Sequence, residues 1–277
     1  MARFNSILMI LVYFGELPWF FYLFLNSCKN NTSIDFLLIT DNEVSKKNIP
    51  GNVMILNKSI EEFQILVAKN LDIPVSIPYA YKLCDFKPTY GLIFSDIVKS
   101  YDFWGYGDID VIYGNLRIFI DPPIQKSYEV ITFRPEYLSG CFTLFKNNPR
   151  TNGLFFSSRD YYEVFTNDFY YNFDECNFLH GPLQNGYEII ARVGKEIESM
   201  THVLKRNNQI KSYFDFHLLE GQVGNIEYRK GKLIYKNCLE IALYHFLDFK
   251  KNCQLKNLQF LPIDHFYISE KSIYGIT

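Results

Sequence analysis

Residues 102–116 have the sequence Asp102-Phe-Trp-Gly-Tyr-Gly-Asp108-Ile-Asp110-Val-Ile-Tyr-Gly-Asn-Leu116. The aromatic first part of this segment is typical of a strand, and two aspartates, Asp108 and Asp110, follow that strand at once. Carboxylates at a strand end can converge on a hard cation, and oxygen ligands suit Mg²⁺ or Mn²⁺. A cation bound there would neutralise a diphosphate and stabilise it as a leaving group. We therefore expect Asp108 and Asp110 to bind a metal ion.

Strands and helices alternate before this segment. The predicted strands are 7–14, 34–39, 53–56 and 101–107, and the predicted helices are 18–29, 59–71, 79–86 and 91–99. Ser59 is the expected N-cap of the second helix, with Glu61 and Glu62 in its first turn. The alternation favours an α/β fold with a mixed, mainly parallel central sheet. In open sheets of this kind the ligand crevice lies beyond the carboxyl ends of the strands, where the two aspartates would lie.

The second half of the chain is less regular. Its predicted strands are 129–133, 141–146 and 239–246, and its predicted hairpin is 225–236 with Lys230-Gly231 at the turn. Neither an internal repeat nor a linker rich in proline, glycine or serine divides the chain. We therefore predict one domain over residues 1–277, with a nucleotide-binding half at 1–120 and an acceptor-side half at 121–277.

Composition narrows the functional class. The 277 residues are 48% hydrophobic and 21% charged, which is typical of a globular chain. The net charge of −2 provides no basic excess for a phosphate backbone, so we expect no nucleic-acid partner. Aromatic residues make up 18% of the chain, which favours strands and stacking surfaces for planar or sugar ligands. Six cysteines without any C-x-x-C pair are typical of the reduced thiols of a cytoplasmic protein.

The apolar run from Ile7 to Leu25 has the composition of a membrane anchor or a signal peptide. Gly15, Glu16 and Pro18 interrupt it, and a charge in the middle of a membrane segment is costly. A basic first region and a small-residue cleavage site are also missing. We therefore predict a strand, a turn and a helix rather than a transmembrane segment, and peripheral association with a membrane stays open.

A pair of aspartates separated by one residue is common in loops that bind nothing, so the motif alone is weak. A phosphatase of the haloacid dehalogenase type also carries such a pair after a strand. In that class the nucleophile loop usually opens the chain, whereas two or three strands precede Asp108 here. The context therefore argues against the phosphatase interpretation.

Segments that carry a family pattern are Tyr13-Phe14-Gly15, Ile39-Thr40-Asp41, Tyr81-Lys82-Leu83-Cys84-Asp85-Phe86-Lys87-Pro88 and Phe103-Trp104-Gly105-Tyr106-Gly107-Asp108-Ile109-Asp110. Together they resemble a bacterial GT-A-type glycosyltransferase of a group found among capsule and surface-polysaccharide enzymes. The chain is more distantly similar to the retaining galactosyltransferase-like and Och1-like mannosyltransferase families. The resemblance covers most of the chain, is strongest over residues 7–120, and implies a single GT-A-like, Rossmann-related domain.

The resemblance implies roles for individual residues. Asp108 and Asp110 would bind the metal. The residues that would face the nucleotide base are Tyr13, Phe14, Gly15, Thr40 and Asp41, and Lys82 and Asp85 would lie near the donor. For Lys82 and Asp85 the alternative is a solvated ion pair on a helix surface.

A later segment, Tyr244-His245-Phe246-Leu247-Asp248-Phe249-Lys250-Lys251, partly matches the third metal ligand of the retaining relatives. His245 would complete the metal site, and Lys250 or Lys251 would meet the diphosphate. Imidazole is an acceptable ligand for Mn²⁺ beside carboxylates. Asp248 stands where the relatives have glycine, and the alternative for His245 is a half-buried structural histidine.

The resemblance also points to an acidic pair on the acceptor side. Asp174 and Glu175 would face the donor sugar or the acceptor, and a helix N-terminal pair is the alternative. Ser139-Gly140-Cys141-Phe142 resembles the small-residue strand that lets an acceptor approach the sugar. Of the other histidines, His180 is the best candidate for an acceptor contact.

The favoured interpretation is a glycosyltransferase dependent on Mn²⁺ or Mg²⁺. It would move a hexose from a nucleotide diphosphate sugar, with UDP as the carrier, to a glycan or lipid-linked glycan. The resemblance implies retention; under inversion Asp174 or Glu175 would be the general base. A sugar nucleotidyltransferase would need a glycine-rich basic loop after the first strand, and Gly15-Glu16-Leu17-Pro18 lacks it. A carbohydrate-binding protein without activity is the third possibility.

Overall fold

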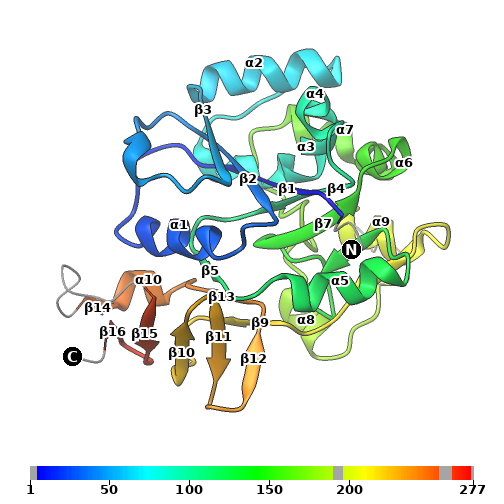
Figure 1. Ribbon diagram of the computed structural model, residues 1–277. Helices are drawn as coiled ribbons and strands as arrows, with labels where there is room; N and C mark the ends of the chain where they lie inside the picture. The colour runs from blue at the N-terminus through cyan, green and yellow to red at the C-terminus, as the bar shows by residue number, and fades with distance from the viewer. Residues whose placement is uncertain (1–4, 190–195, 256–263, 276–277) are drawn as a thin grey trace.

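The computed structural model describes residues 5–189, 196–255 and 264–275 (Figure 1). Within these residues the central sheet has seven strands in the order β3-β2-β1-β4-β7-β6-β8. Their bounds are β1 Ile7–Val12, β2 Asp35–Thr40, β3 Val53–Asn57, β4 Phe103–Gly107, β6 Val130–Thr132, β7 Phe142–Lys146 and β8 Ser212–Phe214. Strands β3, β2, β1 and β4 are parallel, whereas β7 is antiparallel to both β4 and β6. The predicted α/β fold with a mixed, mainly parallel central sheet is confirmed.

Strand β1 lies in the middle of the sheet because both of its faces are apolar. Met9 and Leu11 pack into a core on one face, and Leu8 and Ile10 pack into a core on the other. A strand buried on both faces reads as a continuous hydrophobic run, which is why Ile7–Val12 resembles a membrane segment in sequence. The run to Leu25 forms a strand, a turn and a helix, as predicted, and none of the described helices has the length and apolarity to cross a bilayer.

Helices cover both faces of the sheet. Helix α1 (Phe21–Lys29) buries Phe24 in one core, and α2 (Ile60–Leu71) buries Phe63 in the other; Figure 1 shows them on opposite sides. Ser59 caps α2, as predicted, and the structure adds a capping box with Glu62. The remaining helices are η1 Lys46–Asn48, η2 Ala80–Thr89, α3 Tyr90–Ile93, α4 Ser95–Val98, α5 Arg117–Gln125, α6 Pro149–Asn152, η3 Leu154–Ser157, α7 Tyr161–Thr166, α8 His180–Gln184, α9 Met200–Arg206 and α10 Phe249–Asn252.

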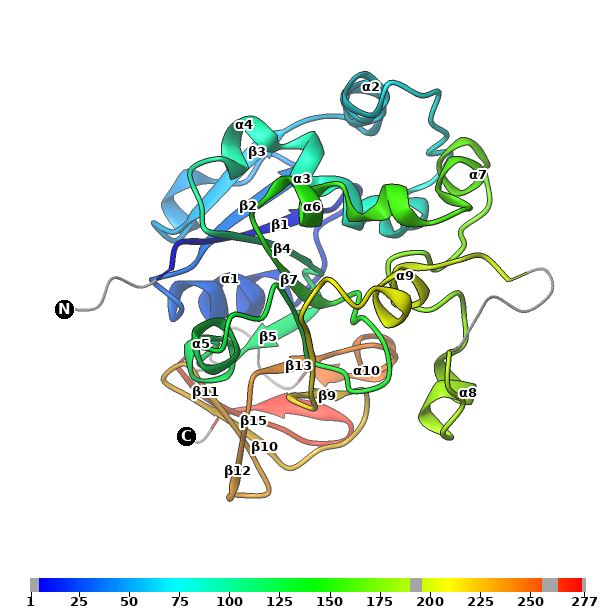
Figure 2. The same cartoon turned by 90° about the vertical axis from the view of Figure 1, so that its right-hand side faces the viewer.

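The described residues form two further sheets. A three-stranded sheet has the order β5-β13-β9, with β5 Val111–Tyr113, β9 Leu218–Glu220 and β13 Leu243–His245. A six-stranded sheet has the order β12-β11-β10-β15-β16-β14, with β10 Ile226–Arg229, β11 Lys232–Tyr235, β12 Leu239–Ile241, β14 Gln254–Leu255, β15 His265–Ile268 and β16 Ser272–Tyr274. Figure 2 shows the smaller sheet between the central sheet and the six-stranded sheet. The predicted hairpin is confirmed: Lys230 and Gly231 take positive φ angles between β10 and β11.

Three element predictions are wrong in detail. The strand predicted at 239–246 is two strands in different sheets, because the chain changes direction at Ala242, whose backbone bonds to Gly114 and His217. The helix predicted at 79–86 is a longer 3₁₀ helix, η2, and the one predicted at 91–99 is two short helices. The division of function at residue 120 stays a prediction.

Candidate functional site

The loops after β1 and β4 meet at one edge of the sheet because these two parallel strands are neighbours. A cavity of about 820 Å³ opens there, and its lining includes Tyr13 and Phe14 from the first loop and Asp108 and Asp110 from the second. Ligand pockets commonly span about 300–1,000 Å³. The cavity therefore has the volume of a ligand site and lies where the fold class predicts one.

Asp108, Asp110 and His245 form a group that we call the aspartate–histidine cluster. One ligand atom from each of them lies within 4.8 Å of the other two, and this group could hold a metal ion. Pairing of β13 with β5 produces the convergence, because His245 lies opposite Val111 and the Phe246 amide donates to the Asp110 carbonyl at 3.0 Å. The pairing of two short strands thus brings together residues that are more than 130 positions apart in the sequence.

Positive groups surround Asp110. Its carboxylate lies 2.6 Å from Lys250 Nζ and 3.4 Å from His245 Nε2. Burial opposes its negative charge, but His245 and Lys250 outweigh burial and lower the pKa of Asp110. Burial likewise opposes the charge of Lys250, and Asp110 raises the pKa of that lysine. Asp110 is therefore ionised and able to serve as an oxygen ligand. Two carboxylates and an imidazole fit a cation such as Mn²⁺ or Mg²⁺ by their donor chemistry.

Asp174 and Glu175, the acid pair, line another side of the cavity. Glu175 accepts hydrogen bonds from the Gly140 amide at 2.7 Å and from Asn172 at 2.8 Å, and its Oε2 lies 2.8 Å from His180 Nε2. Burial opposes its charge, but the bonds from His180 and Asn172 lower the pKa of Glu175 to about 2. Glu175 is a fixed, charged acceptor.

Asp174 differs from its neighbour. Its Oδ1 is buried and has no hydrogen-bond partner among the described residues. Burial raises the pKa of Asp174 well above its ordinary value, and Lys87 only partly offsets this while Glu175 adds to it. Gly140 leaves no room beside the pair, since a Cβ there would lie 2.8 Å from Asp174 Oδ2. The acid pair therefore combines one satisfied carboxylate with one carboxyl group that holds its proton readily.

Lys87 joins the two groups of acids. Its Nζ lies 2.7 Å from Asp108 Oδ1 and 3.5 Å from Asp174 Oδ2, and it donates to the Gly140 carbonyl at 3.0 Å. Burial opposes its charge, but the neighbouring acids, Asp108 first, raise the pKa of Lys87 well above its ordinary value. The sequence interpretation missed this residue, although it stands in one of the segments quoted above.

The three-residue repeat of the 3₁₀ helix η2 explains why Lys87 faces the cavity. In a 3₁₀ helix residues i and i+3 share a face, and Tyr81, Cys84 and Lys87 of η2 all line the cavity. Lys82 and Asp85 belong to a neighbouring face. A helical period of 3.6, which we assumed for this segment, does not separate the two faces so cleanly.

Lys82 and Asp85 lie away from the cavity. They form an ion pair of 2.9 Å with both side chains fully buried, so the alternative of a solvated pair is wrong. Lys82 also donates to the carbonyls of Val164 and Phe169, and Asp85 accepts from the amides of Tyr171 and Phe173. The cavity lining among the described residues includes neither side chain. The structure therefore does not support the predicted contact of this pair with a donor.

Of the other residues predicted to contact the nucleotide-sugar donor, some line the cavity and some do not. Tyr13, Phe14 and Lys250 line the cavity. Gly15, with φ of 98°, donates its amide to Asp41, and Asn42 donates to the Gly15 carbonyl at 2.7 Å, so this part supports the loop after β1. Within the described residues, Gly15, Thr40, Asp41 and Lys251 are not part of the cavity lining. Thr40 is buried, and Lys251 is an exposed partner of Asp248.

Comparison with known proteins gives a family but no activity. The sequence model of a family described as "Family of unknown function (DUF6625)" matches residues 9–276. No protein with curated annotation matches the chain. Among solved structures, the chain is similar to a crystal structure of the galactosyltransferase LgtC in complex with donor and acceptor sugar analogues. The match covers 86% of each chain at 8% identity, with a TM-score of 0.36. So low a TM-score carries no argument, and a functional conclusion depends on the geometry of the cavity.

Proposed function

The chain belongs to the family of unknown function DUF6625, and we propose that it is a metal-dependent glycosyltransferase. In this proposal it moves a hexose from a nucleotide diphosphate sugar, with UDP as the carrier, to a hydroxyl group of a glycan or lipid-linked glycan. A cytoplasmic location is part of the proposal, because six cysteines without paired spacing are typical of a reducing compartment.

The aspartate–histidine cluster carries the proposal. Asp108, Asp110 and His245 come from separate strand ends and still bring their ligand atoms within 4.8 Å of one another. They do so beside a cavity of about 820 Å³, with Lys250 held 2.6 Å from Asp110. Hard oxygen ligands next to a lysine are a suitable environment for a diphosphate, because cation and ammonium both neutralise its charge.

Each side of the cavity has a part in the proposed reaction. Tyr13 and Phe14 offer ring surfaces to the nucleotide base, and Lys250 contacts the diphosphate. A divalent ion bound by Asp108, Asp110 and His245 would supply charge that stabilises the departing diphosphate. Lys87 keeps Asp108 and Asp174 at a fixed separation. Positioning and electrostatics thus supply the rate enhancement, and no covalent step by the protein is needed.

The acid pair faces the sugar and the acceptor in this scheme. Glu175 already accepts three hydrogen bonds, so it orders its surroundings, including His180. Asp174 has a buried oxygen without a partner among the described residues, which suits a bond from a sugar hydroxyl. We propose retention by attack on the same face, with the leaving phosphate taking the acceptor proton. Under inversion Asp174 would be the general base.

The test is a panel of nucleotide sugars, incubated with the protein in Mn²⁺, in Mg²⁺ and in a chelator. We expect slow hydrolysis of one donor that requires the metal and falls at least about a hundredfold in Asp110→Asn, the scale of losing a preorganised charge contact. Asp96→Asn is the matched control, because the Asp96 side chain is 99% exposed and away from the cavity.

One further result would settle the stereochemistry of the reaction, and two others would overturn the proposal. The anomeric configuration of the product, read by NMR, separates retention from inversion. Release of pyrophosphate from a nucleoside triphosphate and a sugar phosphate would identify a nucleotidyltransferase and overturn the proposal. Absence of any metal-dependent turnover or nucleotide binding across the panel would also overturn it.

A further inference from the structure

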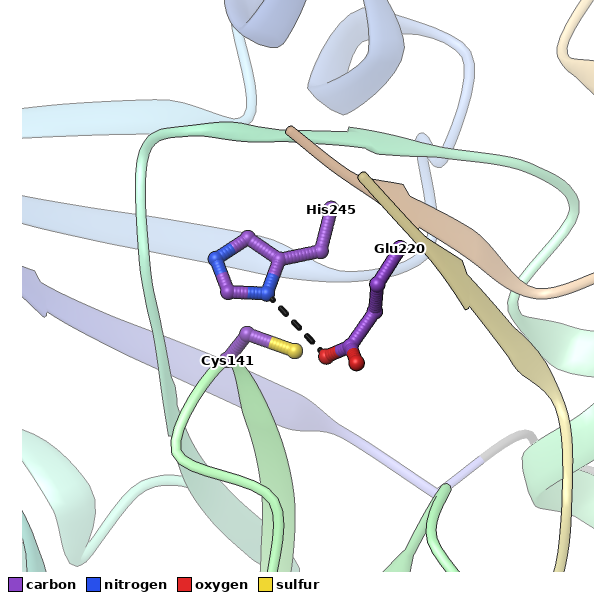
Figure 3. A group of neighbouring side chains, drawn as sticks. All are labelled: Cys141, Glu220 and His245. Carbon is purple, nitrogen blue, oxygen red and sulfur yellow. Dashed lines mark hydrogen bonds and ion pairs between the residues drawn. The ribbon is translucent and has the colours of Figure 1, made fainter. Parts of the chain in front are cut away.

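Cys141, Glu220 and His245, which we call the cysteine cluster, converge from two strands and from the residue just before a third (Figure 3). One ligand atom from each lies within 4.8 Å of the other two, and His245 Nδ1 lies 3.3 Å from Glu220 Oε1. The register of the sheet produces this, because His245 and Glu220 are direct partners in the parallel pair β13–β9. Cys141 immediately precedes β7 of the central sheet. The group therefore rests on rigid elements.

The chemistry of this group differs from that of the aspartate–histidine cluster. The thiolate is a soft ligand and the imidazole a borderline one, so these two together with a single carboxylate suit Zn²⁺ rather than Mg²⁺ or Mn²⁺. We propose that Cys141, Glu220 and His245 form a second metal site, selective for Zn²⁺ and sharing His245 with the first. Three protein ligands leave a fourth position of the tetrahedron, and Glu220 and His245 both border the cavity from which water would fill it.

The surroundings of Cys141 fit a bound thiolate. Its side chain is 2% exposed, and its Sγ lies 3.1 Å from the hydroxyl oxygen of Ser139, which can donate to a thiolate. Arg134 contacts Oε2 of Glu220, so the other oxygen, Oε1, is the one that faces His245. Zinc binding would form a Zn–S bond and release the thiol proton to solvent.

Sharing of His245 makes the two sites compete. His245 turns Nδ1 toward Glu220 and Nε2 toward Asp110, at 3.3 and 3.4 Å. A neutral imidazole with zinc on Nδ1 carries its proton on Nε2, which then donates to Asp110 instead of binding a second metal. Zinc in the cysteine cluster would therefore withdraw His245 from the aspartate–histidine cluster and weaken binding of Mn²⁺ there.

Cobalt spectroscopy tests the site directly. Metal-free protein is titrated with Co²⁺, and we expect a sulfur-to-cobalt charge-transfer band in the near ultraviolet that saturates at one equivalent and disappears when Zn²⁺ is added. Cys141→Ser should lose the band. Cys238→Ser is the matched control, because Cys238 is exposed and does not belong to the cluster, and it should keep the band, as should Asp108→Asn. Circular dichroism checks that each variant is folded.

Either of two outcomes overturns the proposal, and the first needs only the wild-type protein. Absence of the charge-transfer band at saturating Co²⁺, or a band that persists in folded Cys141→Ser, contradicts a thiolate ligand at this position. The readout does not depend on transferase activity. A band in a protein without turnover would support this site while the proposed function fails, and metal-dependent turnover without a band would do the reverse.

Discussion

The 3₁₀ helix η2 provides the lysines of two lysine–aspartate ion pairs that have similar N–O distances but different surroundings. Lys82 and Asp85 are 2.9 Å apart, fully buried, and bonded to backbone groups of residues 164–173. Lys87 and Asp108 are 2.7 Å apart and line the cavity, and Lys87 also reaches Asp174. The first pair fastens the segment that leads to the acid pair, and the second arranges charges around the space for a ligand. A short ion pair therefore says nothing about function until its surroundings are known.

The largest expected effect comes from breaking the buried pair. Asp85→Asn leaves the charge of Lys82 uncompensated in the interior, and we expect the free energy of unfolding to fall by about 3–5 kcal/mol. Urea denaturation measures the loss, and turnover by the folded fraction should stay within a few-fold of wild type. Asp96→Asn removes an exposed partner at the same i,i+3 spacing and should change stability by less than about 0.5 kcal/mol. Equal losses of stability in Asp85→Asn and Asp96→Asn would show that the buried pair stabilises the protein no more than the exposed pair does.

Lys87→Met should reduce turnover strongly and stability little, which is the reverse of what we expect for Asp85→Asn. It removes the ammonium that separates Asp108 from Asp174, so we expect donor turnover to fall about a hundredfold, equivalent to about 2.7 kcal/mol in barrier height. The unfolding midpoint should change less than in Asp85→Asn, because methionine fills the buried space and the acids can take up protons. Steady-state rates and denaturation curves of the same preparation check both statements. Unchanged turnover would show that Lys87 is structural, like Lys82.

Gly140→Ala tests the contacts of Lys87 from the side of the acid pair, because Lys87 donates to the Gly140 carbonyl. The added Cβ would lie 2.8 Å from Asp174 and 2.9 Å from Glu175, so the acid pair must move. We expect a loss of about 1–3 kcal/mol in stability from overpacking, together with reduced turnover. Gly51→Ala is the control, since nothing lies within 4 Å of its Cβ position. Wild-type turnover in Gly140→Ala would argue that the placement of these acids does not matter.

Asp174→Asn should change the free energy of unfolding the least, and it should raise this free energy rather than lower it. The pKa of Asp174 is raised in the folded protein, mainly by burial, so the folded state keeps this proton to a higher pH than the unfolded state does. Its contribution to stability is therefore present below about pH 4, the ordinary pKa of aspartate, and is lost as the pH rises through the folded-state pKa. Asparagine does not ionise, so the variant does not lose this stability as the pH rises. We expect about 1 kcal/mol of added stability at pH 7 but little at pH 4.

Denaturation at the two pH values measures this gain. Equal stability of Asp174→Asn and wild type at pH 7 would mean that the acid costs the fold nothing. A gain in stability accompanied by lower turnover would instead show a site that is maintained at the expense of stability.

The parts of the molecule that sequence predicts well depend on local chemistry. The apolar run of β1, the Ser59 N-cap and the Lys230-Gly231 turn each involve neighbours in the chain, and all three are confirmed. The position of Asp108 and Asp110 after a strand follows from the same local pattern. The association of His245 with them depends on the pairing of β13 with β5, and only the family resemblance pointed to it.

The parts that sequence did not predict depend on contacts between distant segments. Whether Lys82 or Lys87 faces the cavity is decided by the 3₁₀ period of η2 and by packing against residues near 164–173. The break at Ala242 depends on its bonds to Gly114 and His217. The cysteine cluster joins residues 141, 220 and 245, and no local motif marks such a set.

Binding of UDP to the wild-type protein, measured by calorimetry with and without Mn²⁺, tests the central claim most directly. A cation held by Asp108, Asp110 and His245 beside Lys250 predicts saturable binding that needs Mn²⁺ and is lost in folded Asp110→Asn. UDP binding of equal strength in the presence of a chelator, or Mn²⁺-dependent binding unchanged in Asp110→Asn, would contradict it.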